Sequence, residues 1–438
     1  MKTALRLLSL LTLLSLVLTA CASPTPQATL PPVRETVVIT QIVAGTPEIK
    51  IITTTPAPTQ PVPTAAPATG TIVIRAGTGD GGDYYARLLT QLAAKAAPDI
   101  MQVGDDAVPS FVDKGAFVAL DGFIQSEKFD PTIYLPGLLD PGNVAGKQYL
   151  LPKDYSPVAV YYNKKLFDAA GMAYPKEGWT WDDLLATAQK LTKTAAAGKV
   201  TQWGIQLPAT WTTGFEYWVA AAGGTLISQD GKSFTGFMDS PEVIRAVQFY
   251  ADLYNKHKVA PPAADLNQFG GGNADFANGK AAMMIFGRWP QSGFLKNPNI
   301  SLGVVAPPKD KARANVLFWG GFGISSTSKD PKTTFTFLSY YVGEPGAKVW
   351  QDWALPAVKS VAESSGLTQD PIEGVWIGEL NHLVARAYTF TPYWNETADP
   401  ALRKVLETVI LDPKADVKAV LTQAAKDAQV ALDKLNKK

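Results

Sequence analysis

The sequence predicts an α/β protein with two lobes, and three observations lead to this fold class. Short runs rich in β-branched residues alternate with longer runs of helical periodicity from residue 71 onward. Apolar residues make up 46% of the 438 positions, which is far more than one minimal core needs. No repeat occurs at the periods of solenoids or propellers, so the alternation indicates packed α/β lobes.

The expected strands lie between turn signals. Thr71–Arg75 is rich in β-branched residues and ends at the glycine-rich loop Gly77–Gly82. Asp99–Val103 is typical of a short buried strand, and Gly104–Asp106 forms the turn at its carboxyl end. Lys147–Tyr162 is apolar and aromatic but contains two prolines, so two strand segments with a bend between them are expected there.

Helices dominate the remainder of the chain, and some carry clear start signals. Thr180 stands three residues before an acidic residue, as an N-cap does, and Ser240 caps a helix expected over Pro241–Tyr254. Apolar residues recur at helical spacing in Tyr84–Ala97 and again in Val417–Leu435. These signals predict four helices in addition to the strands.

The first twenty residues carry the pattern of a secretion signal. A basic segment precedes the apolar run Leu7–Val17, which is too short to span a bilayer, and small residues lead to Cys21. This order resembles a bacterial lipoprotein signal, which implies removal of residues 1–20 and a diacylglyceryl group on Cys21. The protein is then expected to be lipid-anchored on the extracellular face of the cell membrane. An ordinary secretory signal or a poor transmembrane helix is the alternative.

Residues 21–70 are expected to be a lipidated cysteine followed by a disordered linker rich in proline and threonine. Residues 22–70 contain ten prolines and eleven threonines but few charges. Prolines at this density remove backbone donors and favour extended conformers. The alternative is a pair of short strands, Val37–Val43 and Ile49–Thr55, although Pro47 and the flanking prolines leave little room for a sheet.

Composition excludes several classes of function. The formal charge is only +1, without a long run of either sign, so no nucleic-acid partner is expected. Cys21 is the only cysteine, which leaves no thiol for a disulfide or a nucleophile once it is lipidated. Two histidines do not favour a zinc site or a Ser-His-Asp triad. We therefore expect no catalytic residues, no cofactor and no metal.

Four segments in order carry a family resemblance, and each alone is weak. They are residues 84–121, residues 151–183 with Leu-Pro-Lys-Asp-Tyr at their start, residues 276–289 ending in Phe-Gly-Arg-Trp, and residues 319–338 starting with Trp-Gly-Gly-Phe-Gly. Together they resemble the family-1 extracellular solute-binding proteins of ABC importers, the group that includes maltose-binding protein. The resemblance covers nearly all of residues 71–438.

This resemblance implies the periplasmic-binding-protein type II fold, with two lobes, crossover segments and a ligand cleft between the lobes. Lobe 1 would comprise 71–153 plus 324–370, and lobe 2 would comprise 157–319 plus 371–438. The implied crossovers lie near Lys153–Ser156, Gly320–Gly323 and Gln369–Ile372.

Three glycines in the second of these crossovers, Gly320, Gly321 and Gly323, suit a hinge because glycine tolerates large changes in φ and ψ. Their alternative role is a tight start of a strand or a bulge.

The chain departs from the family pattern near its first strand. In the family, a helix and a second strand separate that strand from the helix that resembles Tyr84–Ala97. Here Gly77–Asp83 connects the two directly, so one helix and one strand are missing. Either the shortened lobe closes with a smaller sheet, or the chain is a damaged copy of the family pattern.

The aromatic residues point to a sugar ligand. Flat C–H faces of sugar rings stack on aromatic planes, and their hydroxyls need planar acceptors and donors. The resemblance places the region from Trp203 to Trp218 on the cleft face of the second lobe. Trp211 and Trp218 are the stacking candidates there, and Glu216 is the candidate hydroxyl acceptor. The alternative for Trp218 is packing beneath the helix, because aromatic residues are usually core residues.

Other candidates come from the crossovers and the cleft loops. Trp289 matches a family position whose aromatic ring faces the cleft, and Trp319 precedes the glycines of the second crossover. Asp106 lies at the carboxyl end of a strand, where open α/β sheets place ligands, and either it or Asp105 is structural. The remaining candidates are Asp154, Tyr155 and Trp394.

The sequence therefore predicts capture of a carbohydrate by a monomer that delivers it to ABC permease subunits, with membrane attachment through Cys21. One alternative keeps the fold but binds glycerol-phosphate, a polyamine or a peptide, and Arg288 is the one basic residue that favours a phosphate. A secreted glycoside hydrolase is a further alternative. It is disfavoured because Asp182 and Asp183 fit the first turn of a helix better than a catalytic pair.

Overall fold

The computed structural model describes residues 38–43, 46–51, 72–75, 82–262, 274–351 and 353–437. The chain forms two units, Met1–Gly70 and Thr71–Lys438. The predicted signal and Cys21 lie outside the described residues.

In the first unit, β1 (Val38–Val43) pairs antiparallel with β2 (Thr46–Ile51). This hairpin is the alternative interpretation of the proline- and threonine-rich stretch, with the second strand starting earlier than expected. Pro47 lies within β2, opposite Ile42. A two-stranded ladder tolerates a proline because each of its strands is an edge strand.

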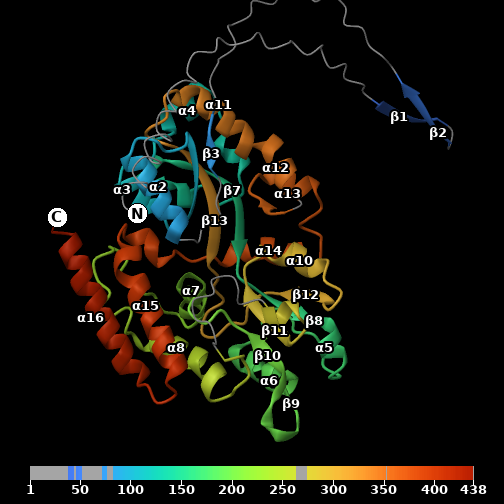
Figure 1. The fold of residues 1–438 in the computed structure, drawn as a ribbon, viewed down its shortest axis with the longest axis vertical. Helices are drawn as coiled ribbons and strands as arrows, with labels where there is room; N and C mark the ends of the chain where they lie inside the picture. Colours follow the sequence, from blue (N-terminus) through green and yellow to red (C-terminus); the bar gives the residue numbers. More distant parts are fainter. Residues whose placement is uncertain are drawn as a thin grey trace, which may run out of the picture. The chain divides into compact units, whose positions relative to one another are not determined.

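In the second unit, the first sheet has the order β14-β7-β13-β4-β3. β13 (Leu317–Ile324) lies at its centre and pairs antiparallel with β7 (Leu150–Pro157) and with β4 (Ile100–Gly104). The edges are β14 (Leu355–Pro356) and β3 (Ile74–Arg75), and β3 runs parallel to β4. Figure 1 shows β7 and β13 side by side along this sheet. We call the part of the unit built on it the first lobe.

The second sheet has the order β12-β8-β11-β10-β9, and the part built on it is the second lobe. Its strands are β12 (Leu302–Val305), β8 (Ala159–Asn163), β11 (Ala281–Phe286), β10 (Val200–Gln206) and β9 (Lys193–Thr194). Every residue of β8 and β11 is buried. Neither strand alternates apolar with polar residues, as expected for strands covered on both faces.

Helices surround each sheet (Figure 1). The helices in the chain segments that carry the strands of the first sheet are α2 (Gly82–Ala93), α3 (Val108–Asp113), α4 (Asp121–Ser126), α11 (Pro331–Val342), α12 (Glu344–Trp350) and α13 (Lys359–Ser364). The others are α5 (Lys164–Asp168), α6 (Trp181–Leu191), α7 (Thr212–Ala221), α8 (Pro241–Asn255), α9 (Ala274–Ala277), α10 (Gln291–Leu295), α14 (Glu373–Gly378), α15 (Trp394–Leu411) and α16 (Val417–Leu435). In the described part of the chain, no helix is both long enough and apolar enough to cross a membrane.

The sequence signals for helix starts are confirmed. Thr180 caps α6 in a full capping box with Asp183, and the Ser240 side chain accepts a hydrogen bond from the backbone N–H of Val243 at the start of α8. These caps depend on neighbours within one turn, so the sequence alone determines them.

The direct connection that the sequence indicates between the first strand and the following helix is present, whereas a shortening of the first lobe relative to the family stays a prediction. Only residues 76–81, which are outside the described part, separate β3 from α2. The sheet therefore ends at β3, and α2 leads directly into β4. The two-sheet α/β architecture confirms the predicted fold class.

The chain passes between the two sheets near the first expected crossover and shortly before the second. Val158 alone separates β7 from β8, so Lys153–Ser156 lies within a strand just before the passage. The return to the first sheet runs through residues 306–316, and Gly320–Gly323 lies inside β13. Asn315 joins these two passages, because its side chain accepts a hydrogen bond from the Val158 N–H and donates one to the Val158 carbonyl.

Candidate functional site

A single pocket of about 930 Å³ is lined by both lobes. The first lobe contributes the carboxyl end of β4 and parts of β7, β13 and β14, and the second lobe contributes the turn after β11, the start of α7 and the start of α15. Its volume is near the upper end of the range of about 300–1,000 Å³ that small-molecule sites occupy. The pocket therefore has room for more than one sugar ring.

Trp211 and Trp289 line this pocket together with Phe318. The Trp211 ring stacks on Phe318 with centroids 4.7 Å apart, and Trp289 stands edge-on to Trp211 at 5.5 Å. Trp289 is 43% exposed although three rings touch it. Gly287 makes this placement possible, because a Cβ there would overlap the Trp289 indole. Both predicted tryptophans thus lie at the pocket, and Trp289 presents much of its ring to it.

Trp319 also lines the pocket, but it is almost completely buried. Its indole N–H donates to the carbonyl of Leu138 at 2.8 Å, and a Cβ on Gly321 would overlap its ring. The register of β13 against β7 shifts between Gly320 and Gly321, which is an irregularity of the kind that a β-bulge produces. Close packing around Gly321 therefore explains the absence of a side chain there without any hinge motion. A hinge at Gly320, Gly321 and Gly323 stays a prediction.

The two acids after β4 both line the pocket but differ in environment. Asp105 is buried, and its carboxyl group accepts a hydrogen bond from the backbone N–H of Trp319 at 3.1 Å. Burial raises the pKa of Asp105 to about 8, with Arg386 opposing and Asp106 adding to the rise. Asp106 is partly exposed at the pocket. Asp105 is therefore the structural member of the pair, whereas the Asp106 carboxylate accepts a long hydrogen bond from the Tyr85 hydroxyl at 3.5 Å and stays a predicted ligand contact.

Asp154 and Tyr155 lie side by side on β7 and line the pocket as predicted. The Asp154 carboxylate forms an ion pair with Lys153 at 2.6 Å. The Tyr155 ring is buried, burial raises the pKa of its phenol, and its hydroxyl has no hydrogen-bond partner among the described residues. A buried hydroxyl without a partner is unfavourable, so this one is suited to bind a polar ligand group.

Three sequence candidates lie away from the pocket lining. Trp218 packs against Trp181, Tyr217, Phe249 and Tyr250, which is the alternative that the sequence left open. Trp394 is buried beside Phe234. Glu216 is buried and accepts hydrogen bonds from Arg386 and from the backbone N–H of Ala387. We therefore correct the assignment of these three residues to the ligand site. The rings of Trp218 and Trp394 pack against other aromatic rings, and the Glu216 carboxylate is paired with Arg386.

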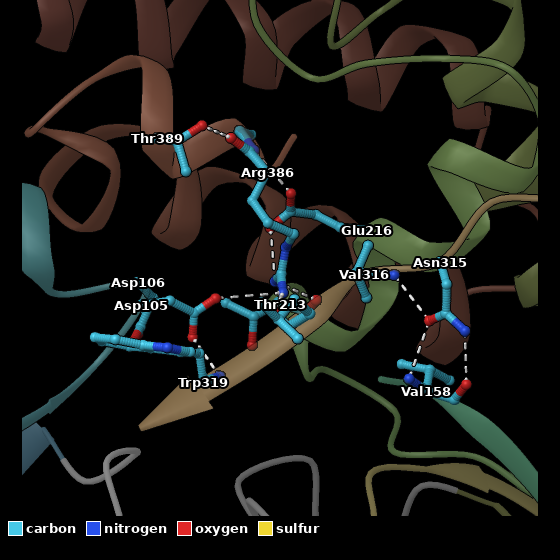
Figure 2. Close-up of polar contacts among 12 residues, drawn as sticks. Asp105, Asp106, Val158, Thr213, Glu216, Asn315, Val316, Trp319, Arg386 and Thr389 are labelled. Atoms are coloured by element: carbon cyan, nitrogen blue, oxygen red, sulfur yellow. Dashed lines mark hydrogen bonds and ion pairs between the residues drawn. The ribbon is translucent and has the colours of Figure 1, made fainter. Parts of the chain in front are cut away.

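Arg386 is the main pocket residue that the sequence analysis missed. Its guanidinium donates to the carbonyls of Leu317 and Thr213. It also pairs with Glu216 at 3.1 Å, and Figure 2 shows Arg386 beside Thr213 and Glu216. It also lies 4.9 Å from the Phe318 ring centroid. An arginine flanked by Ala385 and Ala387 in an apolar stretch was the one available signal, because such a residue is usually buried only when it is paired.

Arg288 is neither a surface residue nor a free phosphate ligand. It lines the pocket but is buried, and its guanidinium forms a bidentate pair with Glu373 at 2.7 and 2.6 Å. Further pocket residues that sequence reasoning did not nominate include charged and polar side chains just after α3 and on α15, and a tryptophan before β14. Among them are Lys114, Trp353, Asn395, Glu396, Asp399 and Arg403. Their convergence depends on the packing of the lobes, which no local motif reports.

No group of three or more His, Cys, Asp or Glu residues in the described part of the chain is placed to hold a metal ion. Asp183 accepts hydrogen bonds from the Thr180 backbone and hydroxyl, which lowers the pKa of its carboxyl. The hydrolase alternative would use Asp182 and Asp183 as its catalytic pair. Asp183 instead belongs to the capping box at the start of α6.

Comparison with known sequences identifies one family and several relatives. The family of bacterial extracellular solute-binding proteins matches residues 59–348. A binding protein of Brucella abortus is 28% identical over 366 residues, covering 80% of this chain and 83% of that protein. The mannitol-binding protein of Pseudomonas aeruginosa is 25% identical over 302 residues, covering 65% of this chain and 63% of that protein.

Solved structures share the same architecture. An ABC substrate-binding protein of Listeria monocytogenes in complex with cycloalternan superposes with a TM-score of 0.72 at 28% identity, covering 80% of this chain and 89% of that chain. A solute-binding protein of Thermotoga lettingae bound with α-D-tagatose has a TM-score of 0.70 at 25% identity, with coverages of 80% and 89%. The maltodextrin-binding domain of Bdellovibrio bacteriovorus, at 19% identity and a TM-score of 0.67 over 81% of this chain and 88% of that chain, shows the fold alone.

Proposed function

The chain belongs to the family of bacterial extracellular solute-binding proteins, and we propose that it captures a sugar or oligosaccharide in the pocket between its lobes. It is a substrate-binding protein of an ABC transporter and belongs to a family of transport proteins rather than enzymes. The proposal adds the ligand class, the residues that hold the ligand and the membrane anchor.

One observation carries the ligand class: indole rings from both lobes line one pocket beside carboxylates and the buried Tyr155 hydroxyl, which has no hydrogen-bond partner among the described residues. Trp211 and Trp289 come from the second lobe, and Trp319 comes from the first. Rings of this kind stack on the C–H faces of sugars, while Asp106 and Tyr155 suit the hydroxyl groups. An apolar wall with a few polar groups is typical of a small-molecule site.

The relatives support the same ligand class. Cycloalternan and tagatose are bound by two of the structural neighbours, and mannitol is named for one sequence relative. All three are polyhydroxylated compounds without a net charge. A phosphate ester is less well supported, because Glu373 already neutralises Arg288.

Capture proceeds through closure of the two lobes. The ligand first contacts one lobe of an open form, and contacts with both lobes then stabilise the closed form. Affinity in the micromolar range requires about −8 kcal/mol, which a few stacked rings and hydrogen bonds can supply. The closed protein, acting as a monomer, then docks on the ABC permease subunits.

A thermal-shift screen of residues 71–438 tests the ligand class. The probes are mannitol, D-tagatose, maltose, maltotriose, mannotriose and cycloalternan, with glycerophosphocholine and an amino acid mixture as the competing classes. We expect one or more of the carbohydrates to raise the melting temperature in a concentration-dependent way. A shift with glycerophosphocholine or amino acids and none with any carbohydrate would contradict the proposal.

The anchor is tested separately on the full-length chain in a bacterial host. Cys21 is expected to carry the lipid, so the wild-type protein should sediment with membranes. Cys21→Ser should leave the protein as an unprocessed precursor or release it to the soluble fraction. Metabolic labelling with a fatty acid should mark the wild type only, and equal labelling of the variant would refute lipid attachment at this residue.

A further inference from the structure

Two tryptophans at the pocket are exposed, and they come from different lobes. Trp289 follows β11 in the second lobe and is 43% exposed, while Trp353 precedes β14 in the first lobe and is 63% exposed. Both line the pocket. Large apolar side chains that are solvent-exposed at a pocket indicate a surface for binding. The sequence analysis nominated only Trp289.

Arg288 connects the chain segments that carry these two rings. It is the residue directly before Trp289, and its guanidinium donates to the backbone carbonyl of Trp353 at 3.2 Å. Its backbone N–H donates to the Ser156 hydroxyl of β7 at 2.7 Å. Arg288 belongs to the second lobe, whereas its partners Trp353 and Ser156 belong to the first lobe. These contacts therefore join the lobes at the end of the pocket nearest β14.

A buried network holds the Arg288 side chain in place. Glu373 accepts both arms of the guanidinium and also accepts a hydrogen bond from Gln291 at 2.8 Å. Gln291 in turn accepts the indole N–H of Trp376 at 2.7 Å. Burying a charge pair is unfavourable unless its hydrogen bonds are satisfied, and here they are. The network therefore holds the Arg288 side chain in one orientation. In this orientation its guanidinium donates the hydrogen bond to the Trp353 carbonyl.

Polar groups lie next to this end of the pocket. β14 pairs with β7, so that Leu355 is opposite Tyr155 and Pro356 is opposite Asp154. Asp154 and Lys153 line the pocket and form an ion pair with each other, and Lys153 also lies 4.8 Å from the Trp350 ring centroid. Charged groups that line the pocket beside exposed rings can accept and donate hydrogen bonds to the hydroxyls of a stacked sugar.

We propose that Trp353 and Trp289 form one ring-stacking subsite at the β14 end of the pocket, and that Arg288 is the positioning residue that assembles it across the two lobes. The occupant is the apolar face of one pyranose unit of an oligosaccharide. This inference rests on the proposed function and adds the residues that would contact one sugar unit at this end of the pocket. Because the Arg288–Trp353 contact joins the lobes, the subsite is complete only in the closed form and favours closure when it is occupied.

The test measures dissociation constants by calorimetry with the carbohydrates that shift the wild type, including maltotriose and mannotriose. Trp353→Ala should weaken binding by about tenfold, and Trp353→Phe should restore most of the loss because its ring still stacks. Tyr340→Ala is the matched control, since Tyr340 is 64% exposed and lies outside the pocket lining. It should bind like the wild type.

The outcomes separate this inference from the function on which it rests. Wild-type binding that Trp353→Ala leaves unchanged overturns the subsite alone. Failure of the wild type to bind any carbohydrate of the panel overturns the proposed function and the subsite with it. Equal losses in Trp353→Ala and Trp353→Phe also overturn the subsite, because stacking would then not explain the effect.

A double-mutant cycle tests the positioning role of Arg288. If Arg288 acts through Trp353, Arg288→Lys should weaken carbohydrate binding severalfold in the wild-type background and have little effect in the Trp353→Ala background. Melting temperatures of the apo variants show separately how much stability each change removes. A purely structural Arg288 would give additive losses of affinity in the two backgrounds, and that result would refute the positioning role.

Discussion

Arg386 and Asp105 approach each other across the pocket, with the Arg386 Nη1 atom 3.9 Å from the Asp105 Oδ2 atom. Arg386 belongs to the second lobe and Asp105 follows β4 in the first, and Figure 2 shows both beside Trp319. Both residues are buried, and the guanidinium of Arg386 also forms an ion pair with Glu216 at 3.1 Å. The two lobes are thus joined at the pocket through a buried polar contact.

The burial of Asp105 makes the stability of the protein depend on pH. The pKa of Asp105 is raised from 3.8 to about 8, chiefly by burial. The folded state therefore holds a proton that the unfolded state has released, and the free energy of unfolding should fall as pH rises from about 4 to about 8. Asp105→Asn cannot ionise and should reduce this decline. Denaturant unfolding at several pH values measures it.

The matched control for this experiment is Asp182→Asn, which changes an exposed carboxyl at the start of α6. Its pH profile should follow the wild type. If Asp105→Asn also follows the wild type throughout this range, the raised pKa of Asp105 is refuted.

Trp289 and Trp218 should respond in opposite ways to removal of the ring. Trp289→Ala should abolish the ligand-induced thermal shift and leave the apo melting temperature nearly unchanged, because much of the ring is exposed. Trp218→Ala should lower the free energy of unfolding by about 3–5 kcal/mol, because it leaves a cavity in the core. Thermal unfolding with and without carbohydrate measures both. Collapse of apo Trp289→Ala would show that Trp289 is a core residue.

Gly321 should not tolerate a side chain. A Cβ there would overlap the Trp319 indole, so Gly321→Ala should cost about 1–3 kcal/mol of stability and weaken ligand binding by displacing that ring. Gly293→Ala in α10 is the control, because nothing lies within 4 Å of its added Cβ and alanine favours a helix. Denaturant unfolding distinguishes them. A Gly321→Ala protein as stable as the wild type would contradict the packing role.

Asn315 should be essential where the chain passes between the lobes. Its amide donates to the Val158 carbonyl and to Glu379, each at 2.8 Å. Asn315→Asp removes these donors and places a second carboxylate beside Glu379, so we expect a loss of about 3 kcal/mol or more. Asn381→Asp, at an exposed position nearby in the chain, should change little. Similar denaturation midpoints for the two variants would contradict this prediction.

Among the candidate residues, those that reach the pocket lining include side chains whose position follows directly from their own strand or turn, and their contact with a ligand stays a prediction. Asp106 and Tyr155 are carried by strand ends and strands that the sequence indicated, and both line the pocket. Sequence reasoning failed for Glu216 and Trp218, which lie on α7 and are buried. A helix presents residues to the core and to the cleft within a single turn, so spacing alone does not tell which of them reaches the ligand.

The sequence by itself determined the α/β class and the helix caps at Thr180 and Ser240, because these depend on neighbours along the chain. Only the tertiary structure decided that Arg386 and Trp353 reach the pocket and that Arg288 is paired with Glu373. The physical reason is distance along the chain. Such partners lie 85 residues apart in the case of Arg288 and Glu373, and only the packing of the two lobes brings them together.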